Sequence, residues 1–132
     1  MAEYNRPSVK TQSLKVNNVD IGKVFLTGEI ANISSAASSW VVSPIAGNIT
    51  KIQTVIDGAI TVGDAAITFE IGGTAVTGGS ITIAHSGSGA GTVDSCEPTA
   101  LNTVAAGGAI EIITDGGSTD AAKAVVLIEI TP

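Results

Sequence analysis

Aromatic and charged side chains are scarce in this chain of 132 residues. Aromatic residues make up 3% of the sequence and charged residues 14%, whereas soluble domains usually carry about 25% charged residues. The core must therefore be built from Val, Ile, Ala and Leu, which supply most of the 44% of residues that are apolar. Together with 16 glycines and many Thr and Ser, this composition is typical of strands and turns.

Cysteine and histidine each occur once, as Cys96 and His85. A single cysteine excludes an intrachain disulfide and suits synthesis in a reducing cytoplasm. One Cys and one His cannot build a zinc centre. We expect Cys96 to be a small buried apolar residue.

Long hydrophobic runs are absent as well. No apolar run approaches the roughly 20 residues of a membrane span. Residues 1–10 are polar and lack the apolar centre of a signal peptide. The sequence therefore predicts a protein made in the cytoplasm and not directed to a membrane.

Positive charge is scarce outside the N-terminal region. The net charge is -6, and four of the six Lys and Arg residues lie within the first 23 residues, against two acids. The remaining residues carry ten acids and two bases, for a charge of -8. Because this acidic part of the chain repels phosphate, we expect no nucleic-acid partner. It also lacks the basic surface that anionic membranes attract.

Alternation of apolar and polar residues predicts about eight antiparallel strands. These strands are expected within nine candidate runs, 23–31, 39–43, 48–56, 66–71, 74–77, 80–85, 92–96, 104–114 and 121–131. Turn residues separate them about every 8–12 residues, the spacing of a β-sandwich or barrel. We therefore predict an all-β fold with a β-sandwich domain at 23–132 and an extended N-terminal arm at 1–22.

Four local expectations are more specific. Gly78-Gly79 should separate two strands, and residues 98–102 should hold one helical turn with Pro98 at its first position. In the last strand, Val125 and Leu127 are expected to be buried, with Ile128 and Ile130 as further candidates. Gly72-Gly73 is expected to form a two-residue hairpin turn.

The search for catalytic motifs finds only weak candidates. His85 borders a Ser/Gly loop, but the Gly-X-Ser-X-Gly elbow of a hydrolase and its helix are missing. The run 87–91 lacks the Lys of a phosphate-binding loop. Asp115 and Asp120 flank a Gly-Gly-Ser-Thr segment, and a hairpin turn explains them better than calcium, which wants six to eight oxygens. We therefore expect no enzyme, no cofactor and no metal.

Trp40 opens a short apolar run, Trp40-Val41-Val42. As a core residue it would contribute the largest buried area in this aromatic-poor chain, and we favour that interpretation. The alternative is an interface anchor, since Trp is enriched at binding hot spots.

Several segments resemble one family of small phage head proteins. These are Trp-Val-Val-Ser-Pro-Ile-Ala-Gly-Asn-Ile-Thr-Lys-Ile-Gln-Thr-Val-Ile-Asp-Gly at 40–58, Gly-Asp-Ala-Ala-Ile-Thr at 63–68, Gly-Gly-Ser-Ile-Thr-Ile at 78–83 and Val-Ala-Ala-Gly-Gly-Ala-Ile-Glu-Ile at 104–112. The last is similar to a viral jelly-roll corner, with Gly108 where Asp is commoner.

The resemblance covers about the last 95 residues and is to trimeric jelly-roll cement, or decoration, proteins of icosahedral heads. It implies a jelly-roll-like β-sandwich of about eight antiparallel strands. It also implies a homotrimer that binds the major capsid protein at the virion surface and stabilises the capsid.

The arm lies outside this resemblance. Its basic residues Arg6, Lys10 and Lys15 suit a capsid contact, in which the arm would add a strand to a neighbouring sheet. A disordered terminus is an equal alternative. A different function also stays open, a phage fibre or tail-associated β-domain that binds host-surface carbohydrate, which a surface row of aromatics would favour.

Overall fold

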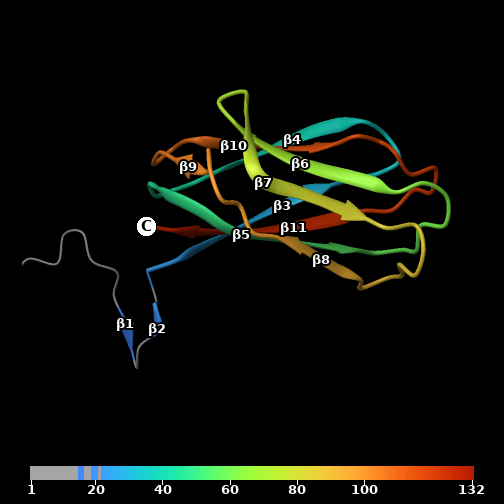
Figure 1. Ribbon diagram of the computed structural model, residues 1–132, viewed down its shortest axis with the longest axis horizontal. Helices are drawn as coiled ribbons and strands as arrows, with labels where there is room; N and C mark the ends of the chain where they lie inside the picture. The colour runs from blue at the N-terminus through green and yellow to red at the C-terminus, as the bar shows by residue number, and fades with distance from the viewer. Residues whose placement is uncertain (1–14, 17–18, 21) are drawn as a thin grey trace, which may run out of the picture.

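The computed structural model describes residues 15–16, 19–20 and 22–132, and these contain strands but no helix. Two sheets pack face to face, as Figure 1 shows. The strands are β1 (Lys15–Val16), β2 (Val19–Asp20), β3 (Val24–Ile30), β4 (Ala37–Val42), β5 (Gly47–Ile56), β6 (Ala65–Ile71), β7 (Thr74–Ile83), β8 (Val93–Cys96), β9 (Thr103–Val104), β10 (Ala109–Thr114) and β11 (Ala124–Thr131). With no helix in the described part, no helical membrane span is found there.

The four-stranded sheet has the order β4-β10-β6-β7, and the five-stranded sheet has the order β3-β11-β5-β8 with β9 also paired to β5. All pairs are antiparallel. The short strands β1 and β2 pair with each other and form a separate two-stranded sheet. The predicted all-β sandwich is confirmed.

Isoleucine dominates the core between the two sheets, and among the described residues Phe69 is the one aromatic buried there. Side chains alternate across a strand, so every second residue reaches the core. Ile52 and Ile56 of β5 are buried in this way. Gly72 and Gly73 join β6 to β7 with φ values of 60° and 79°, the left-handed pair that a tight hairpin turn needs. The predicted hairpin is therefore confirmed.

Two local predictions on the β7 side are wrong. β7 continues through Gly78-Gly79 without a break. Its register with β6 shifts between Thr68 and Glu70, so a bulge in β7 accommodates the two glycines. Residues 98–102 form no helical turn. Instead, the Thr77 N–H donates to the Ala100 carbonyl, so this segment runs beside β7.

The prediction for β11 is confirmed for Ile128 and Ile130 and wrong for Val125 and Leu127. Val126, Ile128 and Ile130 are buried, whereas Leu127 is 37% exposed and Val125 is half-buried on the outer face. All residues from 124 to 130 except Glu129 are apolar, so hydrophobicity alone does not mark the inner face. The face of β11 that carries Val126, Ile128 and Ile130 packs in the core because the opposite sheet covers that side of the strand.

Candidate interaction surface

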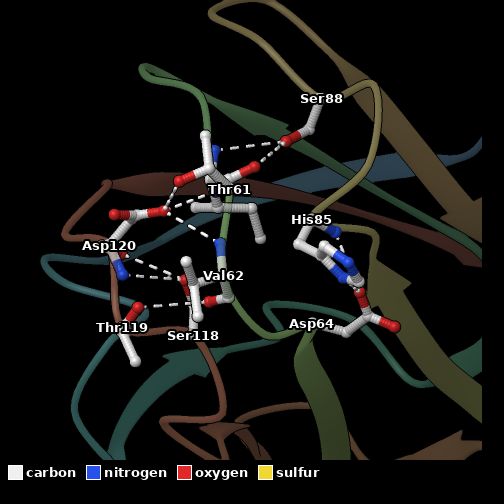
Figure 2. A network of polar contacts seen from close by, with 9 residues as sticks. Thr61, Val62, Asp64, His85, Ser88, Ser118, Thr119 and Asp120 are labelled. Carbon is white, nitrogen blue, oxygen red and sulfur yellow. Dashed lines mark hydrogen bonds and ion pairs between the residues drawn. The ribbon is translucent and has the colours of Figure 1, made fainter.

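Four loops gather at one end of the sandwich, which we call the loop end (Figure 1). They are the loops between β3 and β4, β5 and β6, β7 and β8, and β10 and β11. Aspartate side chains join these loops (Figure 2). The Asp57 carboxylate accepts a hydrogen bond from the Lys123 N–H at 2.8 Å, which links two of the loops. Most residues that could carry chemistry lie in this network.

His85 lies just after β7 and is paired with Asp64. Its Nδ1 lies 2.6 Å from Asp64 Oδ1, and its backbone N–H donates to the same oxygen at 2.8 Å. The hydrogen bond from this backbone N–H is the main reason that the pKa of Asp64 is lowered from its ordinary value. The imidazole therefore helps to hold the loop after β7 against the loop before β6.

Ser88 makes its contacts elsewhere. Its hydroxyl donates to the Ile60 carbonyl at 3.1 Å and accepts from the Ile60 N–H at 3.2 Å. Figure 2 shows His85 directed toward Asp64 and Ser88 directed toward the segment that contains Thr61. His85 and Ser88 of the neighbouring Ser/Gly loop thus have different partners and do not contact each other as a Ser-His pair would.

Asp120 and Asp115 tie separate segments together. The Asp120 carboxylate accepts from the backbone N–H groups of Thr61 and Val62 and from the Thr61 hydroxyl. The bond from the Thr61 N–H is the largest cause of the lowered pKa of Asp120. Asp115 accepts from the N–H groups of Ala66 and Gly117, at 2.9 Å each. Across the described residues no three His, Cys, Asp or Glu side chains are placed to hold a metal ion.

Cys96 ends β8 and is partly buried against the core. Burial raises the pKa of its thiol to about 11. The thiol is therefore protonated at neutral pH, and it behaves as the packing residue that the sequence indicates.

Trp40 points outward from β4 and is 61% exposed, so the favoured prediction of a core position is wrong. Val41 takes the inward position on this strand instead. A Cβ on the facing Gly28 would lie 2.4 Å from Ile112 Cδ1 and 3.1 Å from Val41 Cγ1. The layers meet so closely here that an indole would not fit between them.

Two carboxylates share the outer face of the four-stranded sheet with Trp40. Glu111 of β10 pairs directly with Trp40 on one side and with Glu70 of β6 on the other. Like charges directly opposite each other destabilise a sheet, and neither Glu has an ion pair with a described cation. Val42, two residues beyond Trp40, is also 61% exposed. We call the surface formed by Trp40, Val42, Glu70 and Glu111 the tryptophan face.

The basic residues of the arm cannot be placed beside this face. Arg6 and Lys10 lie outside the described residues, and Lys15 belongs to β1, which pairs with β2. Their predicted contact with a capsid therefore stays a prediction. The neighbours of Trp40 were not predicted because they depend on which strands are adjacent in the sheet.

No protein-family model and no curated protein matches the chain. Two solved structures share a remote likeness. One is the capsid asymmetric unit of cyanophage Pam1, with 12% identity, 96% of this chain and 98% of that chain covered, and a TM-score of 0.44. The other is the P-domain of Macrobrachium rosenbergii nodavirus, with 11% identity, 91% and 98% covered, and a TM-score of 0.38. Both likenesses are too remote to carry a function across.

Proposed function

We propose that this chain is a structural virion protein that binds the outer surface of an icosahedral phage head as a trimer and stabilises the capsid. The observation that carries the proposal is the exposure of Trp40, the largest side chain of the protein, on the outer face of the four-stranded sheet. A side chain of this size is costly to leave in water and is the type that anchors protein interfaces.

The residues that could support catalysis are engaged in holding loops. His85 is paired with Asp64, Ser88 with Ile60, and Asp120 with Thr61. A protein built in this way contributes through its surfaces, which favours a structural role over an enzyme. The family resemblance of residues 39–132 points the same way.

The chemistry of the tryptophan face suits a basic partner. An indole attracts Lys and Arg side chains through its ring, and Glu70 and Glu111 supply negative charge that no described cation neutralises. We propose that this face contacts a patch of the major capsid protein that carries Lys or Arg. The basic arm at 1–22, with Arg6, Lys10 and Lys15, would make a second contact with the capsid beside the sandwich domain at 23–132.

A trimer fits a shell with three-fold positions. Closed cyclic oligomers present the same surface several times. When three copies engage three equivalent sites, the combined affinity exceeds that of one site by about 10² to 10⁴. Weak single contacts would then suffice to hold the protein on the head.

Cosedimentation with heads that lack the protein tests this function. The full chain should bind to saturation, and Trp40→Ala should weaken binding by about 30-fold, as expected for the loss of a hot-spot residue worth about 2 kcal/mol. Val62→Ala, at an exposed apolar residue of the loop end, is the matched control and should bind like the wild type. Equal binding by Trp40→Ala and the wild type would contradict the role of Trp40, and absence of wild-type binding would contradict the function.

The arm needs its own variant. Deletion of residues 2–22 should abolish binding to heads and leave a folded trimer, because the sandwich keeps its core. Full binding by the truncated protein would refute the contact by the arm.

A carbohydrate-binding fibre or tail domain is the second candidate. One observation favours it, since an exposed indole beside carboxylates is also a platform for a sugar ring. The other exposed aromatic among the described residues, Phe25, lies on the opposite sheet, so the two form no row. Binding to a glycan array that is lost in Trp40→Ala, with no binding to heads, would favour this function over the first.

A further inference from the structure

A second apolar surface lies on the other side of the sandwich, on the outer face of the five-stranded sheet. Val125 of β11 pairs with Val55 of β5, which pairs with Val93 of β8, and Leu127 follows Val125 on the same face. Val93 is 55% exposed. The four side chains surround a depression of about 200 Å³. We call this surface the valine face.

Charges on both sides of the valine face are paired. Beside Val125, the Lys123 Nζ lies 3.8 Å from Glu29 Oε2. At the other end of the same strands, Lys23 lies 3.1 Å from Glu129, and Lys51 pairs with Glu129 across the strands. These are the three Lys and Arg residues within 22–132, and all of them lie at this sheet.

The two outer faces of the sandwich therefore differ in charge. The valine face has three carboxylates beside it, Glu29, Asp57 and Glu129, against three lysines, so it has no excess charge. The tryptophan face has Glu70 and Glu111 and no ion pair with a described cation. Two tryptophan faces would repel each other, because their contact would bring four carboxylates together.

We infer that copies of this chain meet through the valine face. Each copy carries a net charge of -6, so copies repel each other unless they approach through a surface without excess negative charge. The valine face is such a surface, and its apolar centre with a polar, charged rim is the usual anatomy of a protein interface. The partner that covers the valine face is therefore a second copy of this chain. This inference rests on the proposed trimer and gives that trimer its contact surface.

The arrangement has a consequence for binding to the head. The two sheets pack face to face, so their outer faces point in opposite directions (Figure 1). An oligomer that buries the valine face of each copy leaves every tryptophan face accessible. Self-association and capsid binding then use different surfaces of the same sandwich.

A pair of matched variants tests the inference. Val93→Asp places a carboxylate in the valine face, on edge strand β8, and Val42→Asp places one in the tryptophan face, on edge strand β4. Both sites are exposed Val residues on outer faces, so both variants should fold. The molar mass of the full chain and of both variants is measured by light scattering, and their thermal unfolding is compared.

The wild type and Val42→Asp should have the mass of a trimer, and Val93→Asp should fall threefold to the 13.0 kDa of one chain with a cooperative thermal transition. Should Val93→Asp fail to fold, Leu127→Asp takes its place. A trimeric Val93→Asp protein would overturn the inference. Dissociation caused by Val42→Asp in place of Val93→Asp would overturn it too, by moving the contact to the other face.

The outcome is separable from that of the head-binding experiment. Wild-type binding to heads together with a trimeric Val93→Asp protein would leave the function standing and remove the valine face. A wild-type trimer that fails to bind heads, and that Val93→Asp dissociates, would contradict the proposed function and support the valine face as the contact between copies. A monomeric wild type would contradict both the trimer and its contact surface.

Discussion

Trp40 occupies a position where the side chain does not support the fold and is available for the contact that we propose. Its neighbours Val41 and Ser43 point inward, and Gly28 leaves no space for a larger side chain at this layer. The indole therefore adds little to the core. Stability and binding can be separated at this residue by substitution.

We predict that Trp40→Ala changes the free energy of unfolding by less than about 1 kcal/mol, as surface substitutions generally do. Phe69→Ala, in the fully buried aromatic of the core, should lower it by about 3–5 kcal/mol. Denaturant titration of both variants measures the difference. A loss in Trp40→Ala that equals the loss in Phe69→Ala would show that the indole packs within the fold.

The aspartate contacts of the loop end predict how stability depends on pH. Hydrogen bonds hold the pKa of Asp64 and of Asp120 below the ordinary value of 3.8, and the pKa of Glu129 is lowered chiefly by the Thr50 hydroxyl. A carboxylate with a lowered pKa in the folded state stabilises it above the pKa of the unfolded chain. That contribution is lost as the pH falls through the lowered pKa.

We therefore predict that the melting temperature falls between about pH 5 and pH 2. Asp120→Asn should melt at a lower temperature than the wild type at neutral pH and show a smaller fall on acidification, because its amide cannot titrate. Glu97→Gln, at an exposed residue of the same charge, is the control. Parallel melting curves for Asp120→Asn and the wild type over this range would contradict the role of the Asp120 carboxylate.

At the residue scale, the sequence indicates which side chains lack a catalytic motif but not which partners they find. His85 is correctly expected beside a loop after a strand. Its partner Asp64 is 21 residues away, and the partner of Asp120 is 59 residues away. Such contacts depend on which loops the fold brings to the same end, and no local pattern reports that.

At the scale of the elements, glycine is required where the backbones of two neighbouring strands approach too closely for a Cβ atom. A Cβ on Gly47, at the start of β5, would lie 2.5 Å from the Thr131 carbonyl oxygen. That oxygen belongs to the backbone of β11, which cannot move without disturbing the pairing of the two strands. Gly58, after β5, has open space at the same position.

We predict that Gly47→Ala lowers the free energy of unfolding by about 1–3 kcal/mol, the usual cost of overpacking. Gly58→Ala should leave stability unchanged or raise it by up to about 1 kcal/mol, because it restricts the unfolded chain. Chemical denaturation of the pair provides the comparison. Equal stability of the two variants would contradict the packing of β5 against β11.

Most strands can be predicted from alternation, as β5 and β6 show, and the failures have identifiable causes. β11 is apolar on both faces, and only the position of Glu129 marks which side is exposed. In β7, two glycines look like a break, but pairing with β6 carries the strand across them. Neighbouring strands determine which face of a strand is buried and where a bulge forms. The sequence of one segment therefore does not predict either feature.

At the scale of the whole molecule, the distribution of charge organises the surfaces. Scarcity of Lys and Arg is visible in the sequence, but the gathering of Lys23, Lys51 and Lys123 at one sheet follows from the strand order. The resulting sandwich has one neutral apolar face and one acidic face with an exposed indole. We expect the neutral face to be buried between copies and the acidic face to contact the capsid.

Imaging of phage heads with and without this protein by cryo-electron microscopy tests the central claim most directly. The account predicts added density on the outside of the head at three-fold positions, in which three sandwiches meet through their valine faces. The tryptophan faces should then lie against the capsid protein. Heads that show no added density, or density of single sandwiches without three-fold arrangement, would contradict it.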